Sequence, residues 1–154
     1  MTQLDKKDTA ILAALQQNGR QSVTELAASV GLSDTPCLRR IRRLEQEGYI
    51  QGYGALLDHR KAGFEVIVYA SLRLSENSDK AAERFETAVA LLPEVMECSV
   101  ITGSHDYLLK IVARDLLAYE RFVKKSLGSL PGVAGIESTL VLKQTFSRNA
   151  LPLE

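Results

Sequence analysis

The sequence has no long hydrophobic run, little cysteine and no net charge, and each of these excludes a class of protein. No stretch approaches the ~18 consecutive apolar residues of a membrane helix, and the first residues, MTQLDKKD, lack the apolar centre of a signal peptide. We therefore expect a cytoplasmic protein without membrane contact. Cys37 and Cys98 are single, distant and surrounded by apolar patterns, so each is predicted to be a small buried residue and not a ligand or disulfide partner.

The residue sets that common enzymes use are also missing. No His and Cys residues have the spacing of metal ligands, no nucleophile accompanies a base, and no glycine-rich loop could hold a phosphate. We therefore expect neither catalysis nor a cofactor, although the fold predicted below hosts many enzymes. With 154 residues, of which 45% are apolar and 25% charged, the chain has the composition of one or two globular domains.

Three helices are predicted near the N-terminus. The first begins after Asp5, a good N-cap, and ends at Asn18-Gly19. Residues 22–25 match the capping-box pattern S-x-x-E, and a glycine at position 31 ends the short helix that follows. The third helix extends to Gly48, with Thr35 as the favoured N-cap and Ser33 as the alternative. Short helices joined by a tight glycine turn are typical of a helix-turn-helix domain.

The third helix carries four arginines within residues 39–43. On a helical wheel at about 100° per residue, one arc is apolar and the opposite side is polar. A run of arginines alone is often a solvated helix face. The short helix before it favours DNA binding instead, because the planar guanidinium suits phosphates and the guanine edge. The apolar arc contains Cys37, Leu38, Ile41 and Leu44; the polar side contains Thr35, Pro36, Arg39 and Arg43, flanked by Arg40 and Arg42.

The charge balance is unusual for a nucleic-acid-binding protein. Residues 1–60 carry 8 basic and 7 acidic groups, a net charge of +1, and residues 61–154 carry 11 and 12, a net charge of −1. The basic charge is therefore local to one helix. Architectural DNA-packaging proteins depend on many phosphate contacts, so this distribution favours docking at specific sites by a small surface, multiplied by oligomerisation.

A second domain is predicted after the polar segment 58–63. Strands are expected over residues 64–74, 95–102, 107–113 and 133 to about 146, with helices ending at Pro93 and Gly128, and a small wing or connecting strand is expected over 49–57. The order β-α-β-β-α-β is that of a ferredoxin-like domain, whose second sheet face is free to pair with another copy. The predicted class is α+β: a (winged) helix-turn-helix domain over 1–60 and a ferredoxin-like domain over 61–154.

Four stretches of the chain carry a resemblance to a known family. They are LDKKDTAILAALQQNGR, TELAASVGLSDTPCLRRIRRLEQEGYIQGYGALLD, TGSHDYLLKIVARDLLAYERFV and LPGV. Together they resemble the Lrp/AsnC (feast/famine) transcription regulators of bacteria and archaea, in the same order and over nearly the whole chain. The resemblance implies double-stranded DNA as a partner, an amino acid as effector, and homodimers that often assemble into octamers.

The resemblance also implies two sites. From the residues alone, Gly103 and Asp106 fit turn chemistry equally well, because both types tolerate unusual backbone angles. Positions 104 and 105 depart from the acidic or aromatic residues common in the family, so the resemblance does not specify the effector. The residues expected to face DNA, within a motif over 23–42 and just beyond it, are Ser33, Thr35, Pro36, Arg39, Arg40 and Arg43. The expected effector site, between dimers, contains Gly103, Ser104, His105, Asp106, Tyr107, Glu137, Ser138 and Thr139.

Overall fold

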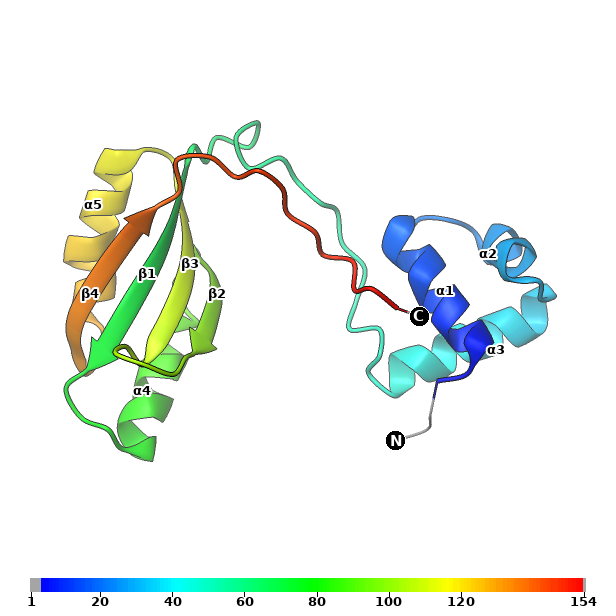
Figure 1. The fold of residues 1–154 in the computed structure, drawn as a ribbon, viewed down its shortest axis with the longest axis horizontal. Helices are drawn as coiled ribbons and strands as arrows, with labels where there is room; N and C mark the ends of the chain where they lie inside the picture. The colour runs from blue at the N-terminus through cyan, green and yellow to red at the C-terminus, as the bar shows by residue number, and fades with distance from the viewer. Residues whose placement is uncertain (1–3, 154) are drawn as a thin grey trace. The chain divides into compact units, whose positions relative to one another are not determined.

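A computed structural model describes residues 4–153 and divides the chain into two compact units (Figure 1). The helical unit contains the residues up to Leu56 and the tail from Thr145 onward; the α/β unit runs from Leu57 to Gln144. The sequence predicts a second domain over 61–154; the tail from Thr145 onward packs with the helical unit. It belongs to the helical unit because Leu153 packs against that unit's apolar core.

The helical unit contains α1 (Lys6–Gln17), α2 (Val23–Val30) and α3 (Asp34–Gln46). Asp5 and Ser22 cap α1 and α2 with complete capping boxes, as predicted. The expected N-cap of α3 at Thr35 is wrong, and the alternative, Ser33, is the N-cap. The Thr24 hydroxyl donates to the Asp34 carboxylate at 2.7 Å, which fixes the first residue of α3 and outweighs the bias that Pro36 exerts on its predecessor.

The tight turn between α2 and α3 depends on glycine. Gly31 has φ of 64°, the left-handed conformation that ends a helix with least strain in glycine. The Lys7 ammonium donates to the carbonyl of Val30 at 2.5 Å, so α1 closes the end of α2. The three helices bury a common core that includes Cys37, whose pKa is raised by that burial. The core contains Ile11, Leu12, Leu26, Ala27, Val30, Cys37, Ile41 and Leu44.

The segment that follows α3 is an irregular connection. Residues 47–65 contain no strand in the described chain, although the sequence suggested one over 49–57. Alternating apolar residues favour an extended backbone there, but a strand also needs another strand to pair with, and the described residues form none beside it.

The α/β unit confirms the predicted order of elements. It contains β1 (Val66–Leu74), α4 (Asp79–Val89), β2 (Val95–Val100), β3 (Tyr107–Ala113), α5 (Leu116–Lys125), a 3₁₀ turn η1 (Leu127–Ser129) and β4 (Val133–Leu140). All pairings are antiparallel, in the order β2-β3-β1-β4. The last strand ends at Leu140, short of the predicted position 146. No helix between residues 4 and 153 is both long and apolar enough to cross a membrane.

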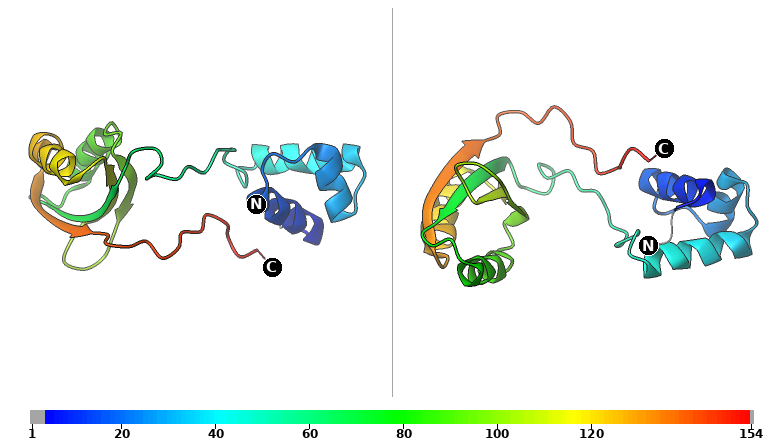
Figure 2. Two further views of the ribbon diagram at one scale, coloured as in Figure 1. Left: turned by 90° about the horizontal axis from the view of Figure 1, so that it is seen from above. Right: turned by 60° about the horizontal axis from the view of Figure 1, so that its bottom comes forward.

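Helices α4 and α5 cover the same face of this sheet (Figures 1 and 2). Their core includes Phe85, Leu109 and Phe122, and the opposite face, the open face, carries no helix of this unit. Cys98 is exposed, which corrects the prediction that it is buried. Its strand, β2, lies at the edge of the sheet, where a neighbour is missing on one side.

Candidate functional site

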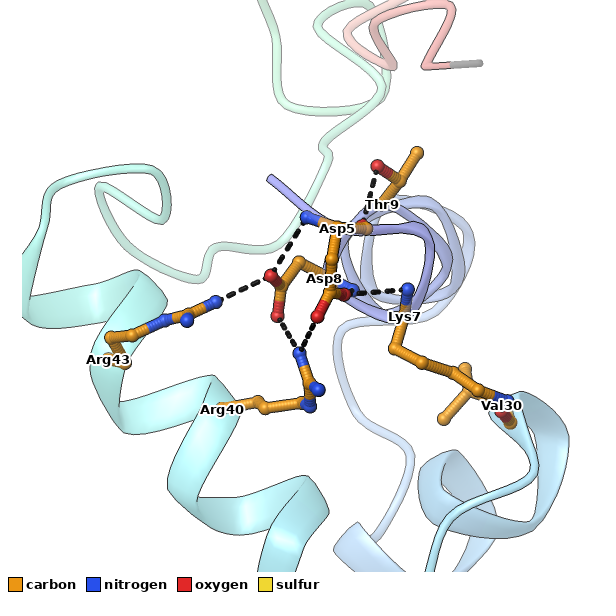
Figure 3. A network of polar contacts seen from close by, with 7 residues as sticks. All are labelled: Asp5, Lys7, Asp8, Thr9, Val30, Arg40 and Arg43. Atoms are coloured by element: carbon orange, nitrogen blue, oxygen red, sulfur yellow. Dashed lines mark hydrogen bonds and ion pairs between the residues drawn. The ribbon is translucent and has the colours of Figure 1, made fainter. Parts of the chain in front are cut away.

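The arginines of α3 divide into two pairs with different surroundings. The Arg40 guanidinium contacts the carboxylates of Asp5 at 2.6 Å and Asp8 at 2.7 Å, and the Arg43 guanidinium contacts Asp8 at 2.5 Å (Figure 3). Asp8 is only 1% exposed, whereas the side chains of Arg40 and Arg43 are 25% and 36% exposed. Both guanidinium groups therefore point to the start of α1.

This geometry gives the four arginines of α3 different surroundings. Arg40 and Arg43 were expected to face the duplex, but their charges are engaged within the protein. Arg39 and Arg42 are exposed and make no ion pair within residues 4–153. The helical wheel places Arg42 at the edge of the polar side. Arg42 follows Arg39 by three residues, so the two side chains lie on one surface of the helix. Of the other residues expected at DNA, Ser33 and Thr35 are exposed and Pro36 is half-buried.

The Asp5 carboxylate stays charged at neutral pH through local geometry. The backbone N–H of Asp8 and the Arg40 guanidinium hold the pKa of Asp5 at about 2. Asp5 also caps α1, where the helix dipole favours a negative charge. Two anions at one helix terminus thus meet two cations of another helix, which orients α3 against α1.

Asp106 ties the turn between β2 and β3 to the end of β1. Its carboxylate accepts from the backbone N–H of Leu74 at 2.7 Å, and its own N–H donates to the carbonyl of Leu72 at 2.8 Å. Gly103, with φ of 114°, adopts a conformation that side chains disfavour. Gly103 and Asp106 therefore both stabilise the backbone of this turn, as their residue types alone suggested.

Three of the predicted effector residues meet beside this turn. The His105 Nε2 lies 3.4 Å from the Glu137 carboxylate, and the Ser104 hydroxyl lies 3.1 Å from the His105 Nδ1. Glu137 is 71% exposed, so its carboxylate has room for another partner. Because side chains alternate along a strand, Thr139 shares the open face with Glu137.

Two other predicted effector residues lie on the opposite face of the sheet. Tyr107 is 3% exposed, and its hydroxyl donates to Glu86 at 2.8 Å; burial, then this bond, raises the pKa of Tyr107 to about 12. Ser138 pairs with the hydroxyl of Tyr119, on α5, at 2.6 Å. The structure thus brings Ser104, His105 and Glu137 together and separates Tyr107 and Ser138 from them.

Comparisons with known proteins match both units of the chain. Residues 4–51 match a winged helix-turn-helix DNA-binding domain, and residues 67–151 match the Lrp/AsnC ligand binding domain. The Bkd operon transcriptional regulator of Pseudomonas aeruginosa is 46% identical over 99% of this chain and 100% of its own length. The chain belongs to the Lrp/AsnC family. It is a DNA-binding transcription regulator with a ligand-binding domain, and not an enzyme.

Other relatives share its full length. The leucine-responsive regulatory protein of Escherichia coli is 40% identical over 98% of this regulator and 92% of its own chain. The crystal structure of a transcriptional regulator of Neisseria meningitidis in complex with L-methionine has a TM-score of 0.92 and 38% identity, covering 98% of this regulator and 97% of that chain. The first matched region contains the three helices, and the second contains the four strands of the sheet, apart from Val66, and extends into the tail.

Proposed function

We propose that this regulator changes its binding to DNA when a free amino acid occupies the open face beside the turn at residues 103–106. The observation that carries the proposal is the convergence of Ser104, His105 and the exposed Glu137 at that turn. A relative of known structure holds L-methionine, and another is named for its response to leucine. The identity of the amino acid is a matter for direct binding measurements.

The chemistry of an amino acid fits the groups present. A zwitterion needs donors for its carboxylate and an acceptor for its ammonium group. The exposed turn at Gly103 and Ser104 can offer N–H and O–H donors, and the Glu137 carboxylate can accept from the ammonium group. The Asp106 carboxylate, the acceptor that the sequence suggested, already accepts from Leu74 and is better regarded as the residue that shapes the site.

Glu137→Gln should weaken amino-acid binding by about tenfold and leave DNA binding without the amino acid unchanged, since a hydrogen bond to a charged group contributes roughly 1.5 kcal/mol or more. The test is anisotropy of a duplex selected from random sequence by the parent regulator, with each amino acid added in turn. Glu120→Gln, on α5, is the control, because Glu120 is also exposed and paired with a neighbouring cation. An unchanged response in Glu137→Gln would place the ammonium site elsewhere.

We propose that the surface of α3 that carries Arg39 and Arg42 contacts the DNA duplex. Ser33, Thr35 and Arg39 keep the role that the sequence predicted, Arg42 joins them, and Pro36 supports the start of the helix. Arg40 and Arg43 instead hold the helix in place. What supports this division is the exposure of Arg39 and Arg42 beside the engagement of the other two arginines with Asp5 and Asp8.

We also propose that the regulator is a homodimer and that four dimers can form an octamer. The open face of the sheet includes the apolar side chains of Tyr69, Leu108 and Val112, and such a face is stable when a second copy buries it. Native mass spectrometry of the full chain should show multiples of 16.9 kDa, beginning at the dimer. A monomer at micromolar concentration would contradict the proposal.

A further inference from the structure

The tail of the chain lies in an apolar groove of the helical unit. Leu153 is half-buried and packs against the helical core, and a cavity of about 410 Å³ remains beside the tail. Leu151 lines the same cavity. The groove is lined by Leu4, by Leu12 and Leu15 of α1, and by Tyr49, Ile50 and Tyr53 of the segment after α3.

A single side chain of α1 recognises the backbone of this tail. The Gln16 amide donates to the carbonyl of Leu151 at 3.2 Å, and its oxygen accepts from the N–H of Leu151 at 2.6 Å. The two residues are 135 positions apart in the sequence. A side-chain amide that makes both bonds to one residue binds an extended peptide as a neighbouring strand would. The groove is therefore suited to a short extended segment of the pattern Leu-x-Leu.

The contact is also weak enough to open and close. Gln16 is exposed, so water competes for both hydrogen bonds, and each shifts the equilibrium between seated and released tail by only about two- to tenfold. The tail continues from β4, the strand that carries Glu137. Between Leu140 and Leu151 the chain contains no helix or strand in the described residues, so the clamp and the packing of Leu153 hold the end of that connection.

We propose that residues 151–153 act as a releasable latch which couples the ligand-binding unit to the DNA-binding unit of the same chain. This inference rests on the proposed response to an amino acid. When the latch is seated, β4 and α1 are joined by a second connection besides the segment 47–65. When the latch is released, the helical unit is held by that one segment, and a change at β4 no longer reaches it through the tail. A ligand alters DNA affinity only through states that differ in binding, and the latch defines two such states.

Two variants test the latch in the full-length regulator. Gln16→Ala removes the clamp alone, and a stop codon at position 151 removes the docked segment. In Gln16→Ala, amide exchange at Leu151 and Leu153 should rise about two- to tenfold per lost hydrogen bond. Both variants should bind the selected duplex as the parent does without amino acid, and both should lose most of the amino-acid-induced change in affinity. Gln17→Ala, a neighbouring exposed position on α1, is the matched control.

The outcomes separate this inference from the proposed function. If the parent itself binds DNA but ignores all amino acids, the proposed effector response is wrong. If the parent responds and both latch variants respond equally well, the latch is wrong. Co-expression of Gln16→Ala with the truncated chain identifies the occupant of the groove. A latch within one chain predicts no recovery of the response, whereas partial recovery would show that the tail docks on a second copy and would overturn the assignment to the same chain.

Discussion

Replacing both Arg39 and Arg42 with alanine should weaken the binding of duplex DNA at least about 30-fold, because an arginine that contacts a base contributes roughly 1–3 kcal/mol. Both side chains are exposed on one surface of α3, and neither has an ion-pair partner within residues 4–153. The net charge of residues 1–60 is only +1, so few other cations can replace the two that are lost.

Anisotropy of the selected duplex over a range of salt concentrations distinguishes the roles of the two arginines. A phosphate contact lowers the slope of log affinity against log salt by about one when it is removed, whereas a base contact relaxes specificity at one position. Arg20→Ala is the control, since Arg20 is an exposed arginine of the same unit outside α3. If the double variant binds as the parent does, and loss of Arg40 or Arg43 abolishes binding in a folded protein, the opposite surface of α3 meets the DNA.

Local features of this regulator could be predicted from sequence because their causes are local. Asp5 and Ser22 cap helices through residues three positions away, and the glycine at position 31 allows the turn by its own conformational freedom. The order of strands and helices follows from the period of apolar residues in each segment. These signals need no knowledge of which segments meet in space.

The features that the sequence did not predict depend on contacts between distant segments. A helical wheel treats Arg40 and Arg43 as free cations, because it contains α3 alone; their partner Asp8 is 32 residues from Arg40 and becomes relevant only when α1 packs beside α3. The apolar pattern predicts a last strand to about residue 146, whereas β4 ends at Leu140 and the chain from Thr145 onward packs with the helical unit. Cys98 lies in an apolar pattern as well, but only the strand order shows that β2 is an edge.

Asp8→Asn is expected to lower the free energy of unfolding of the helical unit by about 2–4 kcal/mol. Removal of one member of a buried ion pair typically costs about 3–5 kcal/mol because the other charge is left without compensation. Here the arginines are partly exposed and Arg40 keeps its contact with Asp5, so we expect a somewhat smaller loss than that range. Asparagine preserves the size of the side chain and removes its charge, which isolates the electrostatic contribution.

Urea denaturation of the full chain, followed by circular dichroism, measures this change. Asp5→Asn is the matched control: it removes one carboxylate from the same network, keeps a residue suited to capping α1, and acts at a side chain that is 51% exposed. Its effect should be clearly smaller, since water screens a half-exposed charge. A double-mutant cycle with Arg43→Met should then recover part of the loss in Asp8→Asn, because the cation left unpaired is itself removed. Equal effects of Asp5→Asn and Asp8→Asn would mean that the burial of Asp8 does not strengthen its ion pairs. The stability of the helical unit would then come from its apolar core.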